Sequence, residues 1–194
     1  MGDLKAIETR YKGYRFRSRL EARWAVFFDA LGIAWEYEKE GYDFGKVGRY
    51  LPDFWLPSLD CWIEIKGQLP TESERALCTE LAEGSGRLVH LFWGQVGPDS
   101  FWGTDDYQEE TMRPVGGESF APTAWVPTLT RGQSSSWSAW WRCTLCGRVF
   151  IDNPLLISHG IATNCGCEGE GILRPPEEAY ATARSARFEH GETP

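Results

Sequence analysis

Apolar residues recur every three or four positions between Ser18 and Gly32. They stand at positions 20, 24, 27, 28 and 31, which is the spacing of one face of a helix. Serine favours the start of a helix and glycine favours its end, so this segment predicts a helix over about 18–31. The next segment, 35–44, alternates aromatic with acidic residues and favours a strand with one face toward water.

The apolar runs that follow have the length of strands. Residues 50–56 and 62–66 are joined by Pro-Ser-Leu-Asp, a turn-rich link that predicts a hairpin. Residues 71–83 carry apolar residues on one side and predict a second helix, and 87–93 is a compact apolar run typical of a buried strand. A helix between two strands provides the crossover that parallel pairing requires. The order α-β-β-β-α-β therefore predicts an α/β fold with a mixed sheet.

The pattern changes after residue 94. Glycine, proline, serine and acidic residues dominate 95–136, and we expect an irregular insertion or linker there. Cysteines and tryptophans characterise 137–176, which we expect to form a small separate module. The tail, 177–194, is polar and predicts at most a short helix.

Three charged residues stand close together on the predicted hairpin. Side chains alternate along a strand, so Glu64 and Lys66 project from one face while Ile63 and Ile65 point into a core. Pairing of the two strands brings Asp53 beside them. Two carboxylates and a lysine at a strand end are typical of a magnesium site that acts on a phosphodiester. The alternative is a turn acid next to an ordinary charge pair on an exposed strand face.

The order of these residues resembles the PD-(D/E)XK nuclease superfamily, whose motif here reads Pro52-Asp53 and then Glu64-Ile65-Lys66. In the subset that includes phage Holliday-junction resolvases and transposon end-cleaving nucleases, a preceding helix carries a further metal-binding glutamate. Glu21 occupies that place in this sequence. The resemblance covers residues 10–94 and implies a restriction-endonuclease-like αβββαβ core.

The resemblance also implies a metal-dependent DNA endonuclease. Its Mg²⁺ or Mn²⁺ would be held by the carboxylates of Glu21, Asp53 and Glu64 and by the main-chain carbonyl of Ile65. Lys66 would orient the attacking water or stabilise the pentavalent phosphate, and cleavage would leave a 5′-phosphate. Several members of the subset act as dimers on branched or paired sites, so the resemblance allows branched DNA as substrate and a homodimer as the active form. A compact nuclease of this kind suits a phage or mobile element.

Other interpretations of these residues remain open. Ser18-x-x-Glu21 is also a capping box, in which the glutamate reaches back to the N-cap amide, and one rotamer cannot serve both roles. A catalytically silent nuclease fold, used as a DNA-binding or adaptor module, is the main alternative function, and metal binding at the acidic cluster would separate the two. A nuclease that acts on RNA is a third possibility.

The net charge of −8 is unevenly distributed along the chain. Residues 1–66 hold 11 basic and 11 acidic residues, so the rest of the sequence carries the whole excess. Basic residues interleaved with aromatic ones near the N-terminus favour a strip that contacts nucleic acid, or else a solvated face. The basic residues of this predicted strip are Lys12, Arg15, Arg17, Arg19 and Arg23.

Four cysteines in two close pairs predict a zinc-ribbon-like module. Cys143 and Cys146 are three positions apart and a glycine follows them, while Cys165 and Cys167 form a tighter Cys-x-Cys pair. Four thiolates can supply the tetrahedral sulfur shell that zinc prefers, and His159 could replace one of the second pair. The remaining cysteines, in the first half of the chain, are expected to be buried thiols.

The zinc module allows two roles. It could only stabilise a segment with too little core to fold alone. It could also contact DNA or a protein partner through Trp140, Trp141, Arg142 and Arg148. The sequence shows no signal-peptide pattern and no apolar run near 18 residues, so we expect a soluble protein of the cytoplasm, in a bacterium or a phage-infected host cell.

Overall fold

The computed structural model describes residues 6–97, 116–122, 136–152, 165, 167 and 173–188. Its main feature is a six-stranded sheet with the strand order β10-β9-β8-β7-β6-β3. β7 and β8 are parallel and the other neighbours are antiparallel, so the sheet is mixed, as the sequence predicts. The strands are β3 (Glu36–Tyr37), β6 (Phe54–Leu56), β7 (Cys61–Lys66), β8 (Leu88–Trp93), β9 (Gly116–Phe120) and β10 (Ser136–Trp137).

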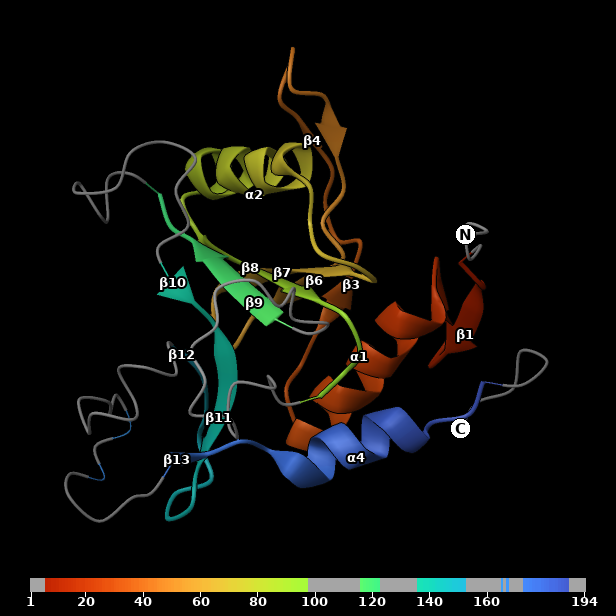
Figure 1. The fold of residues 1–194 in the computed structure, drawn as a ribbon, viewed down its shortest axis with the longest axis vertical. Coiled ribbons are helices and arrows are strands. Elements are labelled where there is room, and N and C mark those ends of the chain that lie inside the picture. The colour runs from red at the N-terminus through yellow and green to blue at the C-terminus, as the bar shows by residue number, and fades with distance from the viewer. Residues whose placement is uncertain are drawn as a thin grey trace, which may run out of the picture.

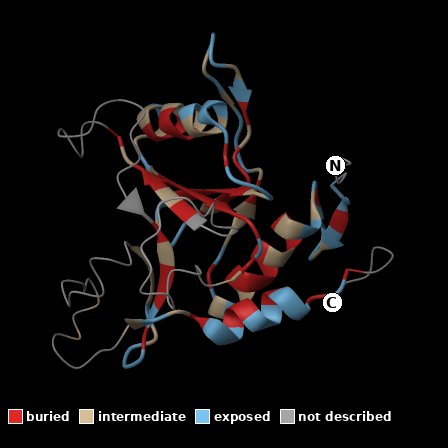
Figure 2. Cartoon of the chain, viewed as in Figure 1, coloured by how far each residue is buried: buried red, intermediate tan, exposed pale blue. Residues whose placement is uncertain are grey.

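Helices cover both faces of this sheet (Figure 1). α2 (Glu72–Ser85) lies on one face, and α1 (Arg19–Leu31) lies on the other beside α4 (Glu177–Ser185). The burial pattern follows these layers, because most residues of β6, β7 and β8 and the inner faces of the helices are buried (Figure 2). No helix in the described ranges is long and apolar enough to cross a membrane.

The predicted helices form where the sequence places their ends. α1 begins after Ser18, whose side-chain oxygen accepts the backbone N–H of Glu21, and ends at Gly32 with a left-handed φ of 72°. α2 has a complete capping box between Thr71 and Glu74. Both helix predictions and the crossover to a parallel strand are confirmed.

The remaining strands form three small sheets. β1 (Thr9–Tyr11) pairs with β2 (Tyr14–Phe16), and β4 (Tyr42–Asp43) pairs with β5 (Arg49–Tyr50). The third sheet has the order β12-β11-β13 and is formed by β11 (Ala139–Cys143), β12 (Val149–Asp152) and β13 (Leu173–Arg174).

The prediction of one strand over 35–44 is wrong. The chain instead forms β3 and β4, which belong to different sheets. Glu38 has a φ of 47°, in the left-handed region, and this turns the chain between the two strands. This turn places the Glu38 side chain beside Arg17.

Part of the segment for which we expected an insertion or linker lies in the main sheet. β9 pairs with β8, and Gly117 lies so close to its neighbours that an added Cβ would come within 2.5 Å of the Ser138 carbonyl oxygen. Only glycine fits there without displacement of the backbone. Gly117 therefore permits close packing in a strand.

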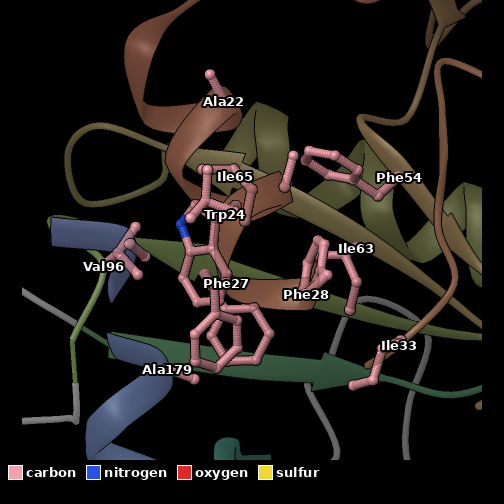
Figure 3. Packing of buried hydrophobic residues seen from close by; sticks show 14 of the residues in the cluster. Ala22, Trp24, Phe27, Phe28, Ile33, Phe54, Ile63, Ile65, Val96 and Ala179 are labelled. Atoms are coloured by element: carbon pink, nitrogen blue, oxygen red, sulfur yellow. The ribbon is translucent and has the colours of Figure 1, made fainter. Parts of the chain in front are cut away.

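The core between α1 and the sheet is rich in aromatic residues (Figure 3). Phe27 packs edge-on against Trp140 of β11, with ring centroids 5.3 Å apart, and stacks on Tyr180 of α4 at 4.6 Å. Trp140 belongs to the same buried cluster as Ile63 of the hairpin. The segment with the first cysteine pair therefore shares a core with the first half of the chain.

Candidate functional site

Asp53 and Glu64 meet across the β6–β7 hairpin. The backbone N–H of Ile65 donates to Asp53 Oδ2 at 2.8 Å, and the backbone N–H of Asp53 donates to Glu64 Oε2 at 3.3 Å. Both carboxylates are buried, at 2% exposure. The strand register fixes this arrangement, because Phe54 pairs with Ile63 and places the residue before β6 opposite Glu64.

Glu21 joins this pair from the first turn of α1. Its carboxylate accepts the hydroxyl of Ser18 at 2.7 Å and the hydroxyl of Tyr37 at 2.5 Å. The backbone N–H that this carboxylate accepts is that of Arg17, at 3.2 Å, and not that of the N-cap residue Ser18. The capping box considered as an alternative role for Glu21 is therefore not formed. Ser18 caps the helix while Glu21, 7% exposed, turns toward the sheet.

Two cations lie beside these acids. Lys66 Nζ lies 2.7 Å from Glu64 Oε1 and 3.6 Å from an oxygen of Glu74 on α2. Arg17 Nη2 lies 2.5 Å from Asp53 Oδ1, and Arg17 Nε lies 2.8 Å from Glu38 Oε1. The site therefore has an arginine on the side of α1 and a lysine on the side of α2.

Burial controls the protonation of these groups. It raises the pKa of Asp53 well above the ordinary value of an aspartate, and the nearby charges of Glu64 and Glu21 add to this effect, while Arg17 opposes it. Burial works against the charge of Lys66, but the attraction of Glu64 outweighs it and the pKa is raised. Lys66 and Arg17 therefore stay charged at neutral pH. Because burial disfavours the ionised form of Asp53, a positive charge beside this carboxylate stabilises it strongly.

The carboxylates offer the oxygen ligands that Mg²⁺ and Mn²⁺ prefer. Within the described ranges, however, only the four cysteines bring three or more ligand atoms within 4.8 Å of one another. Glu21, Asp53 and Glu64 lie in one site without gathering their oxygens to that degree. The donor chemistry fits a hard divalent cation, while the present arrangement is satisfied by protein donors.

The predicted basic strip divides into two kinds of residue. Lys12, Arg15 and Arg19 are exposed, with Lys12 paired to Asp29 at 2.8 Å. Arg23 is half-buried on α1, and Arg17 points into the carboxylate site. Arg17 therefore pairs with the acids of the site and does not belong to the same surface strip as Lys12, Arg15 and Arg19.

Cys143 ends β11, and Cys146 lies on the tight turn that follows. The N–H of Gly147 donates to the Cys143 carbonyl at 2.9 Å, and the N–H of Cys143 donates to the Arg148 carbonyl at 2.9 Å. Backbone N–H groups of Cys146 and Leu145 point at the Cys143 sulfur and lower the pKa of this thiol to about 7. Such N–H···S contacts favour the thiolate, the form that binds a metal ion.

All four predicted cysteine ligands come together. The sulfur atoms of Cys143, Cys146, Cys165 and Cys167 lie within 4.8 Å of one another and could hold a metal ion such as zinc. His159, the substitute ligand in the sequence analysis, lies outside the described residues. The other two cysteines, Cys61 and Cys78, are buried free thiols, as predicted.

The sequence left two roles open for Trp140 and Trp141, and their burial favours core packing over base stacking. Trp140 and Trp141 are 1% and 2% exposed, because they pack into the interior from β11. Arg142 and Arg148 are exposed and stay candidates for a contact with DNA or a protein. Arg142 lies beside Arg174 of β13, at the edge of a cavity of about 930 Å³ between the cysteine turn and the start of α4.

Three residues of the carboxylate site were missing from the sequence analysis. They are Tyr37, which donates to Glu21, Glu38, which pairs with Arg17, and Glu74, which lies beside Lys66. Tyr37 and Glu38 stand in the alternating segment 35–44, which signals a strand but not its distance from α1. Glu74 completes the capping box with Thr71, and this structural role accounts for a glutamate at that position without any role in the site.

Comparisons with models of protein families, with curated proteins and with solved structures found no match for this chain.

Proposed function

We propose that this chain is a metal-dependent DNA endonuclease. One observation supports the proposal above the others: Asp53 and Glu64 are buried side by side at a hairpin, with the Lys66 ammonium 2.7 Å from Glu64. Buried carboxylates are rare unless they are paired or hold a metal, and a mixture of acids and a lysine in one place is suited to phosphoryl chemistry. Glu21 adds a third acid from α1.

The metal ligands in this proposal are the carboxylates of Asp53, Glu64 and Glu21, with the Ile65 carbonyl. The bound Mg²⁺ or Mn²⁺ supplies Lewis-acid stabilisation of the phosphate charge and lowers the pKa of a water molecule. The raised pKa of Asp53 is in keeping with this role, because burial and two neighbouring acids create a demand for positive charge.

Lys66 acts on the substrate side of the site. Its side chain is 27% exposed, while the Glu64 carboxylate that holds it is 2% exposed, so the ammonium lies at the border between the core and solvent. From there it can orient the attacking water or neutralise charge on the phosphate in the transition state. The exposed cations Lys12, Arg15 and Arg19 would attract the nucleic-acid backbone without selecting a sequence.

The cysteine cluster is assigned a structural zinc ion in this proposal. Its four sulfurs suit a closed tetrahedral site with no position left for a substrate. Since Trp140 joins the cluster's strand to the α1 core, the zinc would stabilise the whole fold as well as its own loop.

A silent nuclease fold used as a DNA-binding or adaptor module is the second candidate. It is favoured by the protein donors that already satisfy Asp53, Glu64 and Glu21, and by carboxylate oxygens that do not gather as the cysteine sulfurs do. A silent module would bind DNA equally well in EDTA and in Mg²⁺ and would cut no substrate.

The test is cleavage of labelled duplex, single-stranded DNA, a four-way junction and matched RNA, in Mg²⁺ and in Mn²⁺. The variant is Asp53→Asn, and Asp43→Asn on exposed β4 is the matched control. We expect metal-dependent cutting that falls by about 100-fold or more in Asp53→Asn, the scale of losing one group that stabilises transition-state charge, and is unchanged in Asp43→Asn. Equal cutting by Asp53→Asn and wild type would refute the assignment. No cutting of any substrate by the folded protein would favour the silent module.

A further inference from the structure

Arg17 has an unusual position for a half-exposed arginine. Its guanidinium lies 2.5 Å from Asp53 and 2.8 Å from Glu38, and its Nε is 4.0 Å from Glu21. These acids come from three different parts of the chain: the segment before β6, the turn after β3, and α1. Arg17 therefore bridges the elements that meet at the site.

Each oxygen of the three carboxylates already has a protein donor. A divalent cation that enters must therefore displace a donor or share an oxygen with it. The donors are the Arg17 guanidinium and the Ile65 N–H for Asp53, Lys66 and the Asp53 N–H for Glu64, and the hydroxyls of Ser18 and Tyr37 with the Arg17 N–H for Glu21.

Among these donors Arg17 is the one best placed to leave. The N–H groups of Ile65 and Asp53 belong to the hairpin backbone, and the hydroxyls of Tyr37 and Ser18 are held by β3 and by the cap of α1. The Arg17 side chain is 54% exposed and that of Lys66 is 27% exposed, so water can solvate the guanidinium more readily once it leaves its carboxylate.

We infer that Arg17 is a built-in counter-cation of the carboxylate site, and that a divalent cation competes with its guanidinium for Asp53. The inference rests on the proposed function, because it takes Asp53 as a metal ligand. The arginine stabilises the fold when metal is absent, and it raises the metal concentration at which the site fills. It also explains why the acids lie together without gathering their oxygens as the cysteine cluster does.

The test measures Mn²⁺ binding to the full chain by titration calorimetry, at pH 8.5 to limit competition by protons, and without nucleic acid. The variants are Arg17→Gln and Asp53→Asn. Arg15→Gln is the matched control, because Arg15 lies two residues away, carries the same charge and pairs with Glu8 outside the site. Arg17→Lys serves as a second variant, with a shorter cation that forms one bond instead of a fork.

We expect Arg17→Gln to bind Mn²⁺ about tenfold more tightly than wild type, the change equivalent to one charge-assisted hydrogen bond. Arg15→Gln should match wild type, Arg17→Lys should lie between the two, and Asp53→Asn should lose the site. In metal-free buffer Arg17→Gln should melt at a lower temperature than Arg15→Gln, and Mn²⁺ should reduce that difference.

The outcomes separate this inference from the proposed function. Binding that depends on Asp53 but is equal or weaker in Arg17→Gln overturns the competition and leaves the nuclease proposal intact. An unchanged metal-free melting temperature in Arg17→Gln overturns the counter-cation role. Wild-type protein with no Mn²⁺ binding that depends on Asp53 overturns both proposals together.

Discussion

The cysteine cluster and the carboxylate site, the two sets of candidate metal ligands, differ in what lies beside their ligand atoms. The four cysteine sulfurs lie within 4.8 Å of one another and face each other, whereas the carboxylates of Asp53 and Glu64 are occupied by Arg17 and Lys66. The difference follows from the ligand chemistry. A protein can neutralise carboxylates with its own cations, but no side chain replaces a soft metal ion among four thiolates. Under the proposal, the carboxylate site can thus be stable without a metal ion, whereas the cysteine site depends on one.

The two groups also differ in how the chain builds them. The carboxylates stand on a hairpin and a helix whose backbone bonds are formed within the core. The first two cysteines come from the end of β11 and the turn after it, and the second pair begins nineteen positions later. We therefore expect metal removal to act on folding at the cysteines and on activity at the carboxylates.

Loss of the cysteine metal is expected to have the largest effect. Apparent binding energies of structural zinc are about 10–16 kcal/mol in small zinc domains, so Cys143→Ser with Cys146→Ser should remove the zinc and lower the melting temperature sharply. Elemental analysis should find about one zinc per chain in wild type, by the four-ligand rule, and almost none in the double variant. Cys78→Ala, a buried thiol outside the cluster, is the control and should keep its zinc. Full zinc content in the double variant would contradict the assignment.

Trp140 tests whether the two regions depend on each other. Its ring lies 5.3 Å from Phe27 and 5.9 Å from Phe92, between α1 and the sheet. Trp140→Ala should cost about 3–5 kcal/mol in the free energy of unfolding, measured by denaturant titration, because it leaves a large cavity in the shared core. Leu145→Ala, exposed on the cysteine turn, should change it by less than about 0.5 kcal/mol. Equal effects of the two changes would mean that the regions are independent.

His90 gives a smaller effect that belongs to the sheet alone. It is buried beside the hydroxyl of Ser119 at 2.7 Å, and burial lowers the pKa of His90 to about 4. The unfolded chain binds this proton near pH 6.5 and the folded chain does not, so stability is complete above that pH and falls as the pH drops toward 4. The loss is at most about 3 kcal/mol.

The measurement for His90 is the unfolding free energy between pH 7 and pH 4, compared between wild type and His90→Gln so that acid release of zinc is common to both proteins. His90→Gln should show a flatter dependence on pH over this window than wild type. Identical slopes would show that another group controls the acid sensitivity of the sheet.

Much of the main sheet could be predicted because its signals are local. The apolar stripe of α1, the turn between β6 and β7 and the crossover through α2 all stand in short stretches of sequence. The meeting of Asp53 and Glu64 follows from the hairpin register, which a two-strand pattern nearly determines.

Other features depend on contacts that a pattern does not contain. The bond from Tyr37 to Glu21 needs the actual distance between β3 and α1, and the turn at Glu38 needs a left-handed φ that glutamate rarely adopts. Trp140 shows a different limit, because the same tryptophan-rich pattern suits base stacking and core packing. The glycines of β9 indicated a loop, although Gly117 is there for close packing within the sheet.

The central claim, that the carboxylate site cleaves phosphodiesters, is tested most directly at Lys66. This residue is no metal ligand in the proposal, so its loss should stop the chemistry and leave metal binding in place. The measurement is single-turnover cleavage in Mg²⁺ by Lys66→Met, with Lys39→Met as control because Lys39 pairs with Glu36 away from the site. The account predicts cleavage slower by about 100-fold or more in Lys66→Met, with Mn²⁺ binding kept and Lys39→Met unaffected. Cleavage by Lys66→Met at the wild-type rate would contradict it.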